Sequence, residues 1–171
     1  MRNHFLGFLF ALLAMLPAQA HAQILVSFYS HDLGSTFPHA FFTLSGTPNR
    51  GGAPVAVNYG FTAKSLSPAI LMGSVVGEVE TLSAKYVESS DRQFTVKISD
   101  AQYDSLLALV DKWRKLPGKS YNLNRRNCIH FVGEAAQLLG LKVVIDSKTV
   151  KKPRAFMLSL IALNPWVKGP N

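Results

Sequence analysis

The alternation of apolar and polar residues predicts three strands in the N-terminal half of the chain. Residues 24–29 are β-branched and aromatic, a composition typical of a strand. In a second strand, residues 40–44, one face is wholly apolar and the opposite face begins with His39, because successive side chains point to opposite faces. Residues 55–61 predict a third strand, with valine and aromatic side chains on one face and small or polar ones on the other.

The pattern is less regular beyond the third strand. Residues 62–76 are punctuated by Ser and Pro, and we expect them to be mostly loop. Residues 77–87 and 92–98 are predicted to form a further pair of strands joined through residues 89–91.

Helical spacing of apolar residues follows in the C-terminal half. A helix is predicted from Ser99, whose capping-box partner is Gln102, to a stop at Pro117. A second helix is predicted from Asn127, as its N-cap, to about Leu139, with a glycine following it.

The order of these elements predicts the fold class. Strands come first, helices follow, and residues 153–164 hold at most one further short helix. This order is typical of an α+β domain rather than of a doubly wound sheet. We therefore expect an α+β fold in which a small antiparallel sheet packs against helices.

The first 22 residues resemble a secretory signal peptide. Arg2 supplies a positive start, residues 5–16 are apolar but short for a membrane span, and Ala20-His21-Ala22 offers a cleavage site. We expect an exported protein, periplasmic or secreted, in which residues 23–171 form a single domain with a basic C-terminal tail. An uncleaved membrane anchor is the alternative.

The charge balance favours anionic partners. The chain holds 18 Lys and Arg against 10 Asp and Glu, a net charge of +8. Loss of Arg2 with the signal leaves 17 basic residues and a net charge of +7. Such a charge suits a wall polymer, an acidic lipid or an acidic peptide. Since no aromatic and basic motif accompanies it, we expect no nucleic-acid partner.

Cys128 is the one cysteine in the chain. A single thiol in an exported protein forms no internal disulfide, so it is either a buried, inert side chain or a reactive one. Its place at the start of the second predicted helix favours reactivity, because unpaired N–H groups and the helix dipole stabilise a thiolate. Arg125 and Arg126 add positive charge nearby.

A cysteine nucleophile needs a base, and His39 is the best-placed candidate. It opens a predicted strand, and a rigid sheet is a suitable support for an imidazole that faces a helix start. His31 lies in a predicted loop and is the reserve candidate. His130 lies two positions after Cys128, which points it away from the thiol, so we interpret it as a capping, packing or supporting residue.

A third polar group usually orients the imidazole of such a pair. Asn58 lies centrally on the third predicted strand, and its neighbours on that face, Ala56 and Gly60, leave room for its amide. Thr43, on the strand of His39, is the rival candidate.

Two short segments resemble the motifs of a known enzyme group. Residues 121–131, Tyr-Asn-Leu-Asn-Arg-Arg-Asn-Cys-Ile-His-Phe, and residues 38–42, Pro-His-Ala-Phe-Phe, are similar to those of circularly permuted papain-like enzymes. This group includes NlpC-type peptidases, PPPDE peptidases and lecithin–retinol acyltransferase relatives. The resemblance implies a permuted papain-like fold with Cys128 as nucleophile and His39 as base. We place the motif residues Tyr121, Asn127 and His130 in the lining of the site or its oxyanion-binding part.

Three functions are compatible with these observations. The first is an exported thiol amidase or peptidase acting on cell-wall peptides, since NlpC-type enzymes cut peptidoglycan peptides. The second is a lipid acyltransferase or thioesterase with the same pair, in which apolar residues 156–163 lie on a membrane surface beside basic residues 151–154. The third is a basic envelope-binding domain with a structural cysteine.

Cofactors and metals are not expected. The chain has no C-x-x-C or H-x-x-x-H spacing and no glycine-rich phosphate loop. The expected partner is therefore a peptidoglycan peptide or another anionic envelope component, bound by a monomer.

Overall fold

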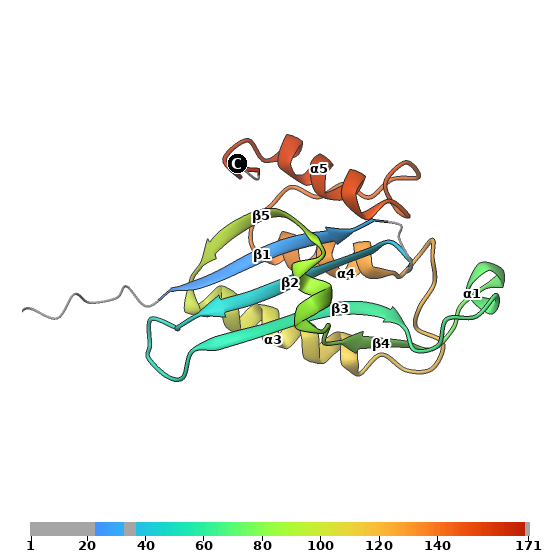
Figure 1. The fold of residues 1–171 in the computed structure, drawn as a ribbon, viewed down its shortest axis with the longest axis horizontal. Coiled ribbons are helices and arrows are strands. Elements are labelled where there is room, and N and C mark those ends of the chain that lie inside the picture. The colour runs from blue at the N-terminus through green and yellow to red at the C-terminus, as the bar shows by residue number, and fades with distance from the viewer. Residues whose placement is uncertain (1–22, 33–36, 170–171) are drawn as a thin grey trace, which may run out of the picture.

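An antiparallel sheet forms the centre of the protein (Figure 1). The computed structural model describes residues 23–32 and 37–169; the expected signal peptide, residues 1–22, lies outside this range. In the described residues the sheet has five strands in the order β4-β3-β2-β1-β5, and every neighbouring pair is antiparallel. The elements are β1 (Ile24–His31), β2 (His39–Gly46), β3 (Val55–Ala63), α1 (Ala69–Met72), β4 (Gly77–Glu80), α2 (Ala84–Glu88), β5 (Asp91–Ile98), α3 (Asp100–Arg114), α4 (Cys128–Leu138) and α5 (Pro153–Leu163). The predicted α+β class is confirmed.

One face of the sheet is covered by α3, α4 and α5 (Figure 1). The apolar face that the sequence predicts for β2 is buried against these helices. Its three side chains are fully buried: Ala40, Phe42 and Leu44. Phe131 of α4 stacks on Phe42 with ring centroids 5.5 Å apart. Trp113 of α3 meets Phe131 edge to face at 5.2 Å. This aromatic cluster holds α4 against the middle of the sheet.

The opposite face of the sheet is crossed by the short helix α2 (Figure 1). Tyr86 of α2 stacks on His31 at 4.4 Å and lies 6.0 Å from Phe41, ring centroid to ring centroid. His39 lies on this same face, since it alternates with Ala40 and stacks on Phe41. One face of β2 therefore belongs to the hydrophobic core, and the other face holds the imidazole of His39.

The predicted pairing of residues 77–87 with 92–98 is wrong. β4 pairs with β3 and β5 pairs with β1, so the two strands lie at opposite edges of the sheet. The cause is local: Ser83 accepts a hydrogen bond from the Tyr86 backbone and begins α2, which replaces the second half of the predicted strand. Residues 62–76, predicted as mostly loop, contain the single turn α1.

The predicted helix starts are confirmed. α3 begins with a capping box between Ser99 and Gln102, and Asn127 is the N-cap of α4. The C-terminal helix is also present as α5, but its apolar side chains Phe156, Met157 and Leu160 are fully buried in the core. The expectation that residues 156–163 lie on a membrane surface is therefore wrong for that side of the helix. Within residues 23–32 and 37–169, no helix is long and apolar enough to cross a bilayer.

Candidate active site

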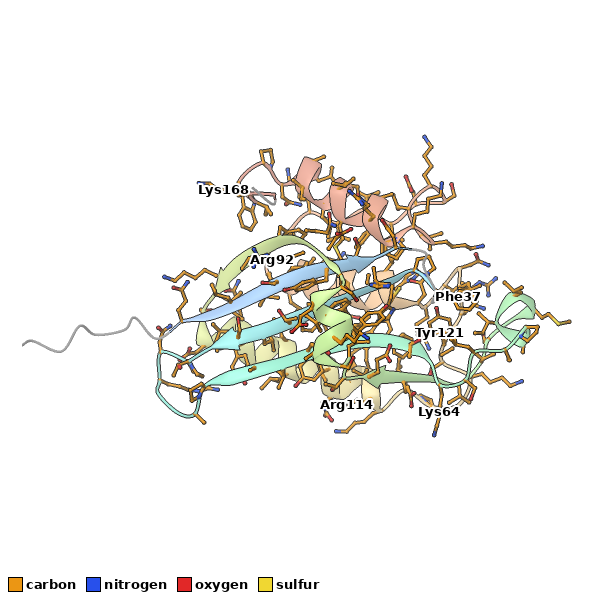
Figure 2. The ribbon with its side chains drawn as sticks, viewed as in Figure 1. Phe37, Lys64, Arg92, Arg114, Tyr121 and Lys168 are labelled. Carbon is orange, nitrogen blue, oxygen red and sulfur yellow. The ribbon has the colours of Figure 1, made fainter. Side chains whose placement is uncertain are left out.

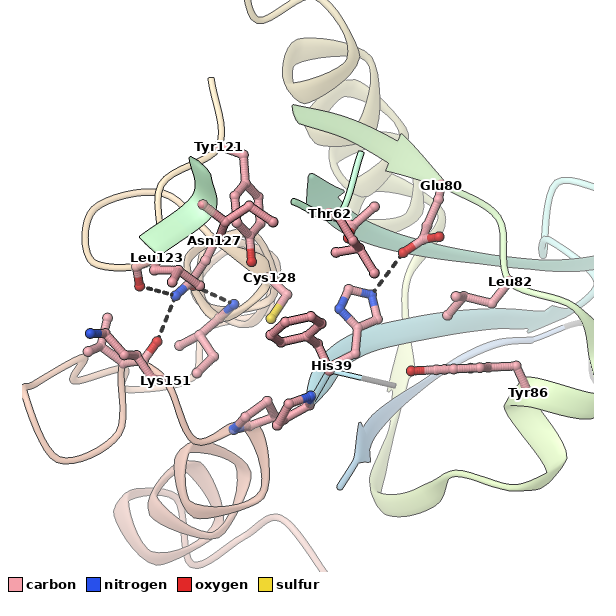
Figure 3. Close-up of a pocket in the computed structure, with 17 residues that line it drawn as sticks. His39, Thr62, Glu80, Leu82, Tyr86, Tyr121, Leu123, Asn127, Cys128 and Lys151 are labelled. Carbon is pink, nitrogen blue, oxygen red and sulfur yellow. Dashed lines mark hydrogen bonds and ion pairs between the residues drawn. The ribbon is translucent and has the colours of Figure 1, made fainter. Parts of the chain in front are cut away.

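A cavity of about 400 Å³ opens where the start of α4 meets the ends of β2, β3 and β4 (Figure 3). Its apolar lining consists of Phe37, Pro38, Leu66, Ile70, Leu82, Leu123, Ile129, Val150 and Pro153. Its polar lining consists of His39, Thr62, Glu80, Tyr86, Tyr121, Asn127, Cys128 and Lys151. The predicted nucleophile and base thus line one cavity, although they are far apart in the sequence.

Cys128 is the first residue of α4 and is only 5% exposed. Burial, and to a smaller extent the nearby charge of Glu80, raise the pKa of its thiol to about 11, against the opposing effect of the N–H groups of Ala40, Ile129 and Cys128 itself. The sequence-based expectation of a stabilised thiolate is therefore wrong for the resting protein, because desolvation outweighs the helix start. The resting thiol is protonated at neutral pH.

Asn127 fixes the position of Cys128. Its side-chain oxygen accepts hydrogen bonds from the backbone N–H of Ile129 at 2.9 Å and of His130 at 3.3 Å, which caps α4. Its side-chain nitrogen donates to the carbonyls of Leu123 and Val150, both at 2.7 Å. Asn127 therefore joins the helix start to two loop segments that line the cavity.

His39 is the first residue of β2 and is 8% exposed. Its ring lies over Gly60 of β3, where any Cβ would come within 2.3 Å of Nε2. Burial, and then the nearby His31, lower the pKa of His39 to about 4. The imidazole is therefore neutral at pH 7 and is able to accept a proton.

The last residue of β4, Glu80, is the acidic neighbour of this imidazole. Its Oε1 lies 3.4 Å from His39 Nε2, which is within ion-pair distance. The alignment is poor, so Nε2 is buried without a hydrogen bond to any residue the structure describes. In Figure 3 the ring lies between Glu80 and Cys128, with Nε2 toward Glu80 and the other ring nitrogen on the side of Cys128. Burial, and then the charge of Glu78, raise the pKa of Glu80.

Glu80 was missed from the sequence. The signal was the alternation of Glu78 and Glu80 along β4, but their place beside β3 depends on a strand pairing that the sequence did not reveal. In the structure Gly60 pairs with Glu80, and paired residues direct their side chains to the same face. The glycine under the ring and the carboxylate beside it are thus adjacent in the sheet.

Asn58, the predicted third group, is not brought to His39. Its amide donates to the Leu82 carbonyl at 3.0 Å and accepts from the Leu82 N–H at 2.6 Å. It pairs with Thr43, further along β2 than His39, and neither residue lines the cavity. Asn58 instead binds the backbone of Leu82, two residues after Glu80, where the chain leaves β4.

Of the other predicted lining residues, Tyr121 lines the cavity and His130 does not. The Tyr121 hydroxyl is directed toward the Cys128 side of the cavity (Figure 3). Burial and the nearby Cys128 raise the pKa of Tyr121, so its hydroxyl keeps its proton and remains a hydrogen-bond donor. The imidazole of His130 accepts from the Asn127 N–H and completes a capping box, the capping role expected from its position.

The reserve base, His31, is the last residue of β1 and pairs with His39 of β2, but it does not line the cavity. Its Nδ1 is 3.0 Å from the Ser90 hydroxyl, and its ring stacks on Tyr86. No group of three His, Cys, Asp or Glu side chains among residues 23–32 and 37–169 is arranged to hold a metal ion.

Comparison with known proteins adds no relative. No protein-family model, no curated protein and no solved structure matches this chain.

Proposed function

We propose that this protein is a cysteine hydrolase of the permuted papain-like type that cleaves an acyl bond. The observation that carries the proposal is the shared cavity, in which the neutral imidazole of His39 lies in space between the thiol of Cys128 and the carboxylate of Glu80. Nucleophile, base and orienting group in this order are the arrangement that thiol-dependent acyl transfer requires.

The chemistry begins with a neutral pair. As the Cys128 sulfur attacks the substrate carbonyl carbon, His39 takes the thiol proton. The imidazole then gives that proton to the leaving amine or alcohol as the C–N or C–O bond breaks, which leaves a thioester on Cys128. Water, deprotonated by His39, hydrolyses the thioester and restores the thiol.

The pKa values of the separate groups overstate the cost of the first step. Proton transfer from a thiol of pKa about 11 to an imidazole of pKa about 4 is unfavourable when each is considered alone. The transfer creates opposite charges side by side, and the imidazolium also faces Glu80 at 3.4 Å. Mutual attraction in a buried site favours this charged pair. Glu80 therefore acts as a positioning residue that stabilises protonated His39.

The oxygen of the tetrahedral intermediate also needs donors. The Cys128 backbone N–H lies at the start of α4, and the Tyr121 hydroxyl is directed to the same side of the cavity. Both groups are fixed by folded structure before substrate arrives, which is the condition under which such donors lower the barrier.

The cavity lining favours a substrate with an apolar acyl group. Phe37, Leu66, Ile70 and Leu123 surround the site, and an apolar wall stabilises a hydrocarbon chain next to the scissile carbonyl. A wall-peptide amidase is the second candidate. Lys151, the one Lys or Arg among the described residues that line the cavity, favours it because an ammonium group suits a peptide carboxylate.

Two substrate sets separate the candidates. Hydrolysis would be followed with p-nitrophenyl esters of increasing acyl length and with purified peptidoglycan peptides, using wild type, Cys128→Ala and His39→Gln. The proposal predicts activity that rises with acyl length and is lost in both variants. His31→Gln is the matched control: this histidine pairs with His39 but does not line the cavity, so the variant should stay active, with the pKa of His39 raised by the loss of its neighbour. Undiminished hydrolysis by Cys128→Ala would exclude the proposed nucleophile.

A further inference from the structure

An exposed apolar surface lies beside the mouth of the cavity, on the segment that joins β3 to β4. Leu66, Leu71 and Met72 are 62%, 77% and 89% exposed. Val76 and Phe37 are also exposed large apolar residues. Figure 2 shows Phe37 at the same end of the molecule as α1. We call these five residues the apolar rim. Scattered exposed apolar residues are ordinary, but so many beside one opening mark an interaction surface.

The apolar rim is continuous with the cavity. Leu66 and Phe37 belong both to the rim and to the cavity lining. Ile70 of α1 is buried into the lining, whereas its neighbours Leu71 and Met72 point outward to solvent. One short helix therefore contributes to the wall of the cavity and to the surface around its mouth.

Exposed cations lie on the rim segment and on the segments next to it. Lys64 is exposed, and its backbone N–H donates to the Val76 carbonyl at 2.9 Å, which places it at the base of the segment (Figure 2). Arg125 and Arg126 are exposed on a loop that is joined to the segment through Tyr121, which pairs with Val75.

A further cation, Lys151, is exposed and lines the cavity together with Leu66. None of these four basic side chains forms an ion pair with a residue that the structure describes. Residues 62–76 contain no acidic residue, and the nearest exposed acid along the chain is Glu78 on β4.

We propose that the apolar rim and these four basic residues dock on the surface of an anionic lipid bilayer, with the cavity mouth facing the membrane. Apolar side chains that enter the acyl boundary and cations that meet lipid phosphates are the two attractions that hold a peripheral protein at a bilayer. A protein partner or a second copy would also cover the apolar residues, but only a polyanionic surface uses all four unpaired cations. The rim thus takes the membrane-facing role that the sequence suggested for residues 156–163 of α5, whose apolar side is buried in the core.

The docking goes beyond the proposed hydrolysis and does not require it. The test uses the full mature chain carrying Cys128→Ala, so that binding is measured without turnover. Sedimentation with vesicles of phosphatidylglycerol and phosphatidylcholine would be compared with pure phosphatidylcholine vesicles. The proposal predicts binding to the anionic vesicles alone, weakened by salt.

The decisive variant is Leu71→Glu with Met72→Glu, because neither residue lines the cavity. Its vesicle binding should fall by at least about tenfold, since two apolar anchors are lost and two like charges are added. The matched control is Leu158→Glu with Trp166→Glu, exposed apolar residues outside the rim, which should leave binding unchanged. When Cys128 is left unchanged, both double variants should hydrolyse a soluble ester at the wild-type rate, which separates docking from catalysis.

Three outcomes would overturn the proposal. The first is no binding to anionic vesicles, and the second is equal loss of binding in the rim variant and in the matched control. The third is a dimer in analytical ultracentrifugation that the rim variant abolishes, because a second copy would then be the occupant of this surface.

Discussion

Gly60→Ala tests whether the position of His39 is essential. The new Cβ would lie 2.3 Å from Nε2, 3.2 Å from Cε1 and 3.4 Å from Cδ2 of the imidazole. Real Cβ atoms essentially never approach closer than 3.0 Å, so the ring must retreat by at least 0.7 Å. The ring is rigid and buried, so it must turn as a whole and alter its 3.4 Å contact with Glu80.

The expected effect is a large loss of activity with a small loss of stability. A displacement of about 1 Å in a catalytic group costs on the order of a hundredfold in rate. The extra methyl group costs about 1–3 kcal/mol of unfolding free energy, as in other overpacked sites. Gly60 has an ordinary strand backbone, so alanine adds no backbone strain there.

The assay compares kcat/KM for ester hydrolysis with the midpoint of thermal unfolding. Gly73→Ala is the matched control, because its φ of 169° is extended and its new Cβ would meet nothing within 4 Å. A folded Gly60→Ala protein that keeps kcat/KM within threefold of wild type, roughly the experimental scatter, would refute the assigned role of His39.

Four further predictions follow from the site. His39→Gln should remove an acid sensitivity of stability. Because the pKa of His39 is about 4 in the folded protein and 6.5 in the unfolded chain, the neutral ring contributes stability that is fully present above pH 6.5 and is lost as the pH falls toward 4. The loss in the free energy of unfolding, measured with urea, should reach about 3 kcal/mol. Asn127→Ala should cost about 3 kcal/mol in the same assay, because it removes a helix cap and two buried hydrogen bonds. The pH dependence of iodoacetamide alkylation should give folded Cys128 a pKa near 11, so that at pH 8 the folded protein carries roughly two hundredfold less thiolate than the denatured protein, whose thiol has a pKa of about 8.5. Glu80→Gln should lower kcat by about tenfold without changing KM, and should move the acid limb of the pH profile to lower pH; an unchanged limb would deny it a positioning role.

Local chemistry explains what could be predicted from the sequence. Alternation places Ala40, Phe42 and Leu44 on one face of β2 and His39 on the other, and the structure agrees. Capping depends on neighbours three residues apart, so the starts of α3 and α4 were also predictable. Because Cys128 follows the cap directly, its position at a helix start needed no tertiary information.

Tertiary structure explains what could not be predicted. The contact between His39 and Glu80 depends on β4 pairing with β3, and the sequence indicated pairing with residues 92–98 instead. Asn58 is predicted because its small neighbours Ala56 and Gly60 leave room for its amide, but its distance from His39 along the sheet and its two hydrogen bonds to Leu82 depend on the register and on the chain after β4. The thiol pKa was misjudged because the helix start is visible in sequence and burial is not.

Trapping the acyl-enzyme shows whether Cys128 is the nucleophile and His39 its base. The mature protein would be mixed with a p-nitrophenyl ester of a long acyl chain, quenched in acid at short times, and analysed by intact mass and peptide mapping. We predict one acyl group on Cys128, formed at least about a hundredfold more slowly in His39→Gln and absent in Cys128→Ala. Acylation of Cys128 at the same rate in wild type and His39→Gln, or turnover with no acyl group on Cys128, would contradict this prediction.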